Sequence, residues 1–174
     1  MPIFAQGVPK DKLTLLHYVS VCGLELTRDQ LYRAMVENDC MSYFDYQTDM
    51  NELEEDGFLA AIPRAFGQGY RITVRGEDVL KMFGESLPLS LRTRLERYAD
   101  EHREQMRQET QLVSSMEEQS DGSYTVTLKA QEKNTVELSI TMRVVSREMA
   151  KRIRSNWADA SEAIYQRMTE LLLK

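Results

Sequence analysis

The hydrophobic pattern of this 174-residue chain changes its period at Gly57, and this change limits the possible folds more than any other feature. Four apolar side chains before the glycine recur at the spacing of one helix face: Tyr43, Tyr46, Met50 and Leu53. After it, residues 58–62 and 70–74 form two short apolar runs that flank a stretch with two glycines. A helix over 43–56 is therefore followed directly by a hairpin over 58–74.

Two more helices precede this segment, and one follows it. Residues 10–22 and 28–38 both carry apolar side chains at helical spacing. Thr27 followed by Gln30 is a capping-box signature, which predicts where the second of these helices begins. After the hairpin, the pattern predicts a helix over 76–85. This helix is expected to bury three apolar side chains: Val79, Leu80 and Phe83.

The second half begins with a long helix and continues into β structure. Pro88 opens the helix, whose apolar stripe turns polar halfway along. Residues 112–145 then indicate β structure, with turn signals at Asp121-Gly122 and Lys133-Asn134. Apolar and polar side chains alternate over 124–128 and 136–142, which predicts an antiparallel sheet with one buried face, and residues 112–118 are a candidate third strand. Ser146 caps a final helix whose apolar residues keep helical spacing to its end, so we expect that helix to cover the sheet.

These patterns predict an α+β protein in three parts. Residues 1–86 form an N-terminal winged helix-turn-helix domain, because three helices followed by a two-stranded hairpin are typical of that fold. Residues 87–111 form a long connecting helix, and residues 112–174 form a C-terminal antiparallel β-sheet packed by a long helix. In a winged helix the third helix, here residues 43–56, is the recognition helix, and the hairpin over 58–74 is the wing.

The predicted recognition helix carries side chains that suit the major groove of DNA. Its outward positions are Ser42, Phe44, Asp45, Gln47, Thr48 and Asn51. Gln and Asn amides can pair with adenine through two hydrogen bonds, and Thr can contact the thymine methyl group. The hairpin offers polar side chains for phosphates or the minor groove: Arg64, Gln68, Arg71 and Arg75.

The chain also resembles a known family along nearly its whole length. The matching residues lie in order: Tyr43-Phe44, Leu53, Gly57, Tyr70-Arg71-Ile72-Thr73, Gly76, Leu80, Phe83, Leu87-Pro88, Leu91-Arg92, Tyr98, Ser155-Asn156-Trp157 and Ile164-Tyr165. They are similar to the bacterial domain-of-unknown-function family 4364. The resemblance implies a winged-helix transcriptional regulator that binds double-stranded DNA.

The distribution of charge predicts a homodimer. The formal charge is -6, and residues 1–86 hold 8 Lys and Arg against 14 Asp and Glu, whereas residues 87–174 hold 14 of each. Non-specific affinity for DNA grows with the number of phosphates that a protein neutralises. One protomer offers only four cations near the interface: Arg28, Arg33, Arg64 and Arg71. We therefore expect a dimer that spans two half-sites about 34 Å apart and is held by the two long helices.

Several features leave two interpretations open. The acidic third helix, with no Lys or Arg between Arg33 and Arg64, either contacts DNA or belongs to a winged-helix protein–protein interaction module without DNA binding. Phe44 is either exposed or covered by the first helix. Residues 143–154 carry five Lys and Arg against one Glu, and they either bind an acidic partner or form a solvated helix face. Trp157 belongs either to the core or to a ligand-stacking site.

Neither an enzyme nor a metal site is expected. The two histidines, His17 and His102, are far apart, and neither has metal-ligand spacing with Cys22 or Cys40. Gly67-Gln68-Gly69 is too short for a phosphate-binding loop. No apolar run approaches the roughly 18–20 residues of a membrane span, and two cysteines fit a reducing cytoplasm. We expect a cytoplasmic protein with no cofactor, no metal and no membrane contact.

Overall fold

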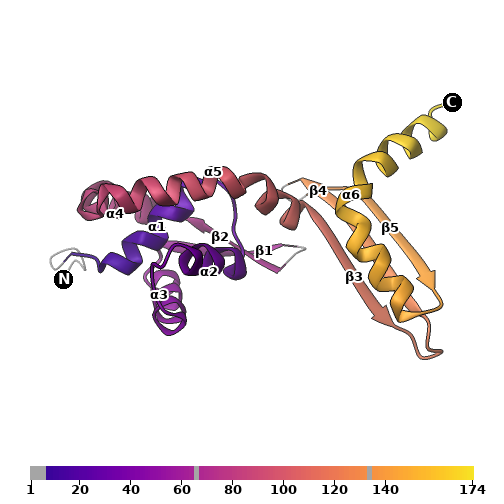
Figure 1. The fold of residues 1–174 in the computed structure, drawn as a ribbon, viewed down its shortest axis with the longest axis horizontal. Coiled ribbons are helices and arrows are strands. Elements are labelled where there is room, and N and C mark those ends of the chain that lie inside the picture. The colour runs from indigo at the N-terminus through magenta and orange to yellow at the C-terminus, as the bar shows by residue number, and fades with distance from the viewer. Residues whose placement is uncertain (1–6, 65–66, 133–134) are drawn as a thin grey trace. The chain divides into compact units, whose positions relative to one another are not determined.

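The computed structural model of the chain describes residues 7–64, 67–132 and 135–174. In these ranges the protein is a mixed α+β chain with six α-helices, one 3-10 helix and two antiparallel sheets (Figure 1). It divides into two compact units, Met1–Met106 and Arg107–Lys174, each with its own hydrophobic core. Within the same ranges, no helix is both long enough and apolar enough to cross a membrane.

Two capped helices begin the first unit. α1 (Lys10–Cys22) ends at Gly23, whose φ of 64° lies in the left-handed region that favours glycine. α2 (Arg28–Glu37) begins with the predicted capping box. The Gln30 backbone N–H donates to the Thr27 hydroxyl, and the Thr27 N–H donates to the Gln30 side chain.

The third helix passes into a hairpin, as the change of period predicts. α3 (Tyr43–Glu55) is followed by β1 (Leu59–Arg64) and β2 (Gly67–Ile72), which pair antiparallel with Ala61 opposite Tyr70. Both strands extend further toward the tip than the sequence indicated. The tip itself, at residues 65–66, lies outside the described residues.

A fourth helix and a short 3-10 turn close the hairpin against the helices. α4 (Val74–Phe83) begins two residues before the predicted start, because the Thr73 hydroxyl caps it and accepts the Gly76 N–H at 3.1 Å. The turn η2 (Gly84–Ser86) leads into α5 (Leu89–Gln111). Of the side chains expected in the core, Val79 is buried, and Leu80 and Phe83 are half-buried against it.

α5 belongs largely to the core of the first unit and is not a free connector. Its buried residues are Leu91, Leu95, Ala99 and Met106. The Tyr18 hydroxyl donates to the Met106 sulfur at 3.5 Å, and the Gln30 side chain donates to the Met106 carbonyl at 3.1 Å. The first unit therefore extends to Met106, beyond the boundary expected at residue 86. The apolar stripe of this helix becomes polar in its second half, so the sequence pattern did not indicate that Met106 is buried.

The second unit is a three-stranded sheet under a helix. β3 (Leu112–Glu118), β4 (Tyr124–Glu132) and β5 (Thr135–Val144) pair antiparallel in chain order. The predicted alternation is confirmed, since the residues facing the helix belong to the core and their neighbours on the other face are mostly polar. The turn expected at Lys133-Asn134 lies outside the described residues.

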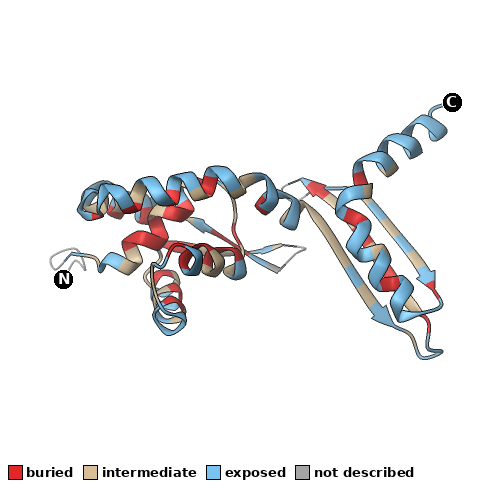
Figure 2. Cartoon of the chain, in the orientation of Figure 1, coloured by how far each residue is buried: buried red, intermediate tan, exposed pale blue. Residues whose placement is uncertain are grey.

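α6 (Arg147–Leu172) covers the sheet along only part of its length (Figure 2). Trp157 belongs to the core at 2% exposure, and its ring nitrogen donates to the Lys129 carbonyl at 3.1 Å. Further along, Met168 is 37% exposed and Leu171 is 51% exposed. The expectation that the apolar stripe is buried to its end is therefore wrong, because the last turns of the helix extend past the strands.

Candidate nucleic-acid interface

α3 has one side in the core and one side open to solvent. Ser42 caps the helix, since its hydroxyl accepts the Asp45 N–H at 3.2 Å and donates to the Asp45 carboxylate at 2.7 Å. Three side chains anchor the inner side at 0% exposure: Tyr46, Met50 and Leu53. On the outer side, Phe44 is 82% exposed, and Thr48 and Asn51 are exposed as well. Phe44 is thus not covered by α1.

The first residue of α3 differs from the predicted pattern. Tyr43 was expected on the buried face, but it is 53% exposed. The ring of Tyr32 on α2 lies edge to face with it at a centroid distance of 5.1 Å, and the ring of Phe44 lies 6.3 Å away. The helix therefore begins with a partly exposed aromatic cluster, formed by Tyr32, Tyr43 and Phe44.

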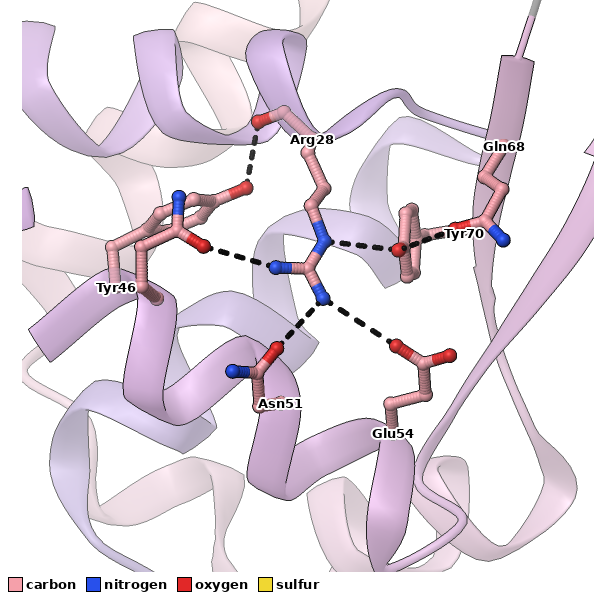
Figure 3. Close-up of polar contacts among 7 residues, drawn as sticks. Arg28, Tyr46, Asn51, Glu54, Gln68 and Tyr70 are labelled. Atoms are coloured by element: carbon pink, nitrogen blue, oxygen red, sulfur yellow. Dashed lines mark hydrogen bonds and ion pairs between the residues drawn. The ribbon is translucent and has the colours of Figure 1, made fainter. Parts of the chain in front are cut away.

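Arg28, the first residue of α2, joins α3 to β2 (Figure 3). Its Nε donates to the Tyr70 hydroxyl oxygen at 2.9 Å. One terminal nitrogen donates to Gln47 Oε1 at 3.0 Å, and the other donates to Asn51 Oδ1 at 2.9 Å. The second nitrogen also lies 3.5 Å from a carboxylate oxygen of Glu54. We call this set of contacts the Arg28 network.

The surroundings of the Arg28 network keep Arg28 charged and Tyr46 protonated, so both groups act as hydrogen-bond donors. Burial works against the charge of Arg28, but the bond to Tyr70 and the nearby Glu54 carboxylate outweigh it and raise its pKa. Burial also raises the pKa of Tyr46, so its hydroxyl stays protonated and donates to the Arg28 carbonyl at 2.6 Å. Two predicted base-contacting residues, Gln47 and Asn51, are thereby held together by one cation.

The hairpin residues have separate surroundings. Arg64 forms a two-pronged ion pair with Glu25, with both N–O distances at 2.5 Å. The Arg64 hydrogen bonds lower the pKa of the Glu25 carboxyl. Gln68 accepts a hydrogen bond from the Tyr70 hydroxyl at 3.1 Å, which connects it to the Arg28 network. Arg71 is exposed on β2.

The side of α3 that faces α1 is acidic. Lys12 of α1 lies 2.5 Å from the Glu52 carboxylate and 4.0 Å from that of Asp56. Burial, together with the nearby Asp11 carboxylate, raises the pKa of Asp49 to about 6, although Lys12 acts in the opposite direction. Because Asp49 is ionised at neutral pH although its surroundings favour the protonated form, its charge lowers the free energy of unfolding there.

Comparison with known protein families shows a match for the chain. The domain of unknown function family DUF4364 matches residues 11–172. The chain belongs to this family. No curated protein and no solved structure matches the chain.

In this DUF4364 protein, the predicted DNA-contacting residues fall into three groups. The Arg28 network gathers Gln47, Asn51 and Gln68. Ser42 and Phe44 lie at the start of α3, and Thr48 is exposed one turn further on. Arg64 is held by Glu25, and Arg71 stands on the neighbouring strand.

Sequence reasoning missed the partners that organise this surface of the DUF4364 protein. Arg28 was counted only as a cation, and neither Tyr70 nor Glu25 was assigned a role. Arg28 lies 23 residues from Asn51 and 42 from Tyr70, and no periodicity links positions so far apart. The single available signal was its place directly after the Thr27 cap, which fixes where α2 starts.

Proposed function

We propose that this DUF4364 protein is a DNA-binding transcriptional regulator of the cytoplasm whose first unit is a winged helix. α3 is the recognition helix, and the β1–β2 hairpin is the wing. The main support for the proposal is that α3 has one buried side and one exposed side. Its inner side is fully buried, while Phe44, Thr48 and Asn51 are open to solvent. A helix anchored in this way can enter a major groove, which is about 12 Å wide. The proposal includes no catalytic step.

A single protomer has few cations to offer a duplex. Of the four arginines counted from the sequence, Arg28 is committed to Glu54 and its neighbours, and Arg64 is committed to Glu25. Arg71 is exposed on the wing. We therefore propose that the protein acts as a homodimer, which doubles the number of phosphate contacts and spans two half-sites.

We place the dimer contact at the C-terminal end of α6. Four apolar side chains are exposed there: Tyr165 at 49%, Met168 at 37%, Leu171 at 51% and Leu172 at 77%. Contiguous exposed apolar surface of this kind marks interaction sites. A second copy of the same helix end, related by a two-fold axis, would cover it with the same residues.

The salt dependence of binding tests the DNA proposal. Affinity for random-sequence duplex DNA is expected to fall steeply between about 50 mM and about 200 mM salt. Arg71→Ala should lower the slope of log affinity against log salt by about 0.9 for each phosphate that the variant no longer neutralises. Lys81→Ala removes another exposed cation, on α4, and should leave the slope unchanged. Absent or salt-insensitive binding contradicts the proposal.

A protein–protein interaction module without DNA binding is the second candidate. It is favoured by the acidity of α3, where Asp45, Glu52 and Glu55 are exposed and no cation occurs between Arg33 and Arg64. Such a face attracts a basic partner. Binding of a lysine-rich peptide that Glu55→Lys abolishes, in a protein that binds no duplex at all, would support this candidate over the first.

A further inference from the structure

We infer that Arg28 sets the base preference of α3 by turning the amide groups of Gln47 and Asn51 so that their NH2 groups face a bound duplex. The inference rests on the proposed DNA-binding function and deepens it. Arg28 is thus a positioning residue, and the two amides read hydrogen-bond acceptors on the bases.

The orientation of both amides follows from the chemistry of their partner. A guanidinium group has five donors and no acceptor, so the amide atom that meets it has to be the oxygen. Arg28 meets Gln47 Oε1 at 3.0 Å and Asn51 Oδ1 at 2.9 Å. The amide nitrogen lies on the other branch of the same planar group and points away from the guanidinium, as Asn51 shows in Figure 3.

Both NH2 groups are available to a ligand. Among the described residues, neither Gln47 Nε2 nor Asn51 Nδ2 has a hydrogen-bond partner. Asn51 is exposed and Gln47 is half-buried on the same side of α3. These donors therefore require a partner outside the chain, either water or a bound base.

The guanidinium is itself held in place, so the amides are oriented before any ligand arrives. Tyr70 accepts from its Nε at 2.9 Å, and the Glu54 carboxylate lies 3.5 Å from a terminal nitrogen. The carbonyl of Arg28 accepts from the buried Tyr46 hydroxyl. Turning either amide over would bring an NH2 group against these N–H donors and break the hydrogen bond.

An outward NH2 group distinguishes the bases by their major-groove edges. Guanine presents two acceptors, O6 and N7, and thymine presents the acceptor O4. Cytosine presents only the N4 donor, and adenine has its N6 donor beside its N7 acceptor, so an approaching NH2 group meets a second donor there. α3 should therefore select guanine or thymine where Gln47 and Asn51 face the duplex. The pairing with adenine predicted from the residue types alone needs the amide oxygen at the base, and Arg28 occupies that oxygen.

Selection from a randomised duplex library with the full chain tests this inference. At the positions that the two amides face, guanine and thymine should be enriched over adenine and cytosine by about tenfold. Gln47→Glu and Asn51→Asp keep the oxygen that Arg28 holds but replace the outward NH2 group with an acceptor. Each variant should unfold like the wild type, lose affinity for the selected site about tenfold, and select adenine or cytosine at its own position.

Two further variants complete the test. Arg28→Lys replaces a planar group that meets Tyr70, Gln47 and Asn51 through separate nitrogens with a single rotating ammonium nitrogen. The amides lose their fixed orientation, so the selection should lose the preference between the two pairs of bases. Gln108→Glu adds the same charge at an exposed position of α5 and should leave the selected site unchanged.

The possible failures are distinguishable. If the wild type selects adenine at these positions, or if Gln47→Glu and Asn51→Asp select the same bases as the wild type, the inference is overturned while the DNA-binding function stands. If no duplex is enriched by the wild type, the proposed function and the inference both fall.

Discussion

At the scale of single residues, three cations of the first unit form ion pairs within it: Lys12, Arg28 and Arg64. Arg28 joins α2 to α3 and β2, and Arg64 of β1 pairs with Glu25. Lys12 lies beside the carboxylates of α3. The pairs made by Arg28 and Lys12 hold the acidic helix α3 against α1 and α2. The cations in these pairs are already neutralised by carboxylates of the same chain.

Replacing Asp49 by Asn should stabilise the protein near neutral pH. The folded pKa of Asp49, about 6, lies above its unfolded value, so the folded state binds the extra proton and loses stability as pH rises through this window. Asp49→Asn removes the cost, which is about 1 kcal/mol after allowance for solvent screening.

Urea unfolding near pH 7.5 and near pH 4.5 measures this effect. The free energy of unfolding should be higher for Asp49→Asn at the upper pH, and the difference should shrink at the lower pH. An equal difference at both values would show that the charge of Asp49 is not responsible.

At the scale of elements, caps and close contacts decide where each helix starts and how near it lies to its neighbour. Thr27, Ser42, Thr73 and Ser146 each accept a backbone N–H from the first turn of a helix. Gly76 lets α4 approach the backbone just before β1, because a Cβ there would lie 2.3 Å from the Phe58 carbonyl oxygen.

Gly76→Ala should destabilise the first unit. The added methyl group meets backbone, which cannot move aside as a flexible side chain can, and the expected loss is about 1–3 kcal/mol. Gly84→Ala is the matched control, since its Cβ would lie 3.7 Å from a Leu80 methyl and should cost nothing or stabilise slightly. Thermal unfolding of both variants measures the difference, and equal midpoints would contradict the close approach.

Ser42→Ala should lower the free energy of unfolding by about 1 kcal/mol, because α3 loses its cap. Ser42→Thr keeps a capping hydroxyl and should recover most of the loss. Urea unfolding of both variants measures the change in the free energy of unfolding. If Ser42→Ala unfolds like the wild type, the cap does not stabilise α3 and the prediction is wrong.

The elements that the sequence predicts well are those with a local signature. The capping box at Thr27, the buried stripe of α3 and the alternation of the three-stranded sheet depend on neighbouring residues, which periodicity reports directly. The Arg28 network could not be predicted, because its members come from α2, α3 and β2. The buried Met106 and the exposed end of α6 depend on where neighbouring elements stop, which the periodicity of one helix does not encode.

At the scale of the whole molecule, the proposed DNA binding depends on two copies of the chain. The formal charge is -6, and the described cations near α3 are partly committed to intramolecular pairs. The second unit has a polar open sheet face and an apolar helix end. In the proposed dimer, that helix end forms the contact between copies and the first unit contacts DNA.

Light scattering should report a dimer, twice the chain mass of 20.2 kDa, at micromolar protein concentration. Leu171→Asp places a charge in the proposed contact and should give the monomer mass. Leu89→Asp changes another exposed leucine, outside α6, and should remain dimeric. A monomeric wild type, or a Leu171→Asp variant that stays dimeric, would contradict the proposed contact.

The most direct test of the central claim is an NMR titration of the full chain with a short random-sequence duplex at low salt. If α3 contacts DNA, the amide signals of residues 44–51 and of Arg71 should shift most, and a lysine-rich peptide should not reproduce the shifts. If the duplex leaves α3 unperturbed while the peptide shifts it, α3 is not a DNA-recognition helix and the regulator proposal is wrong.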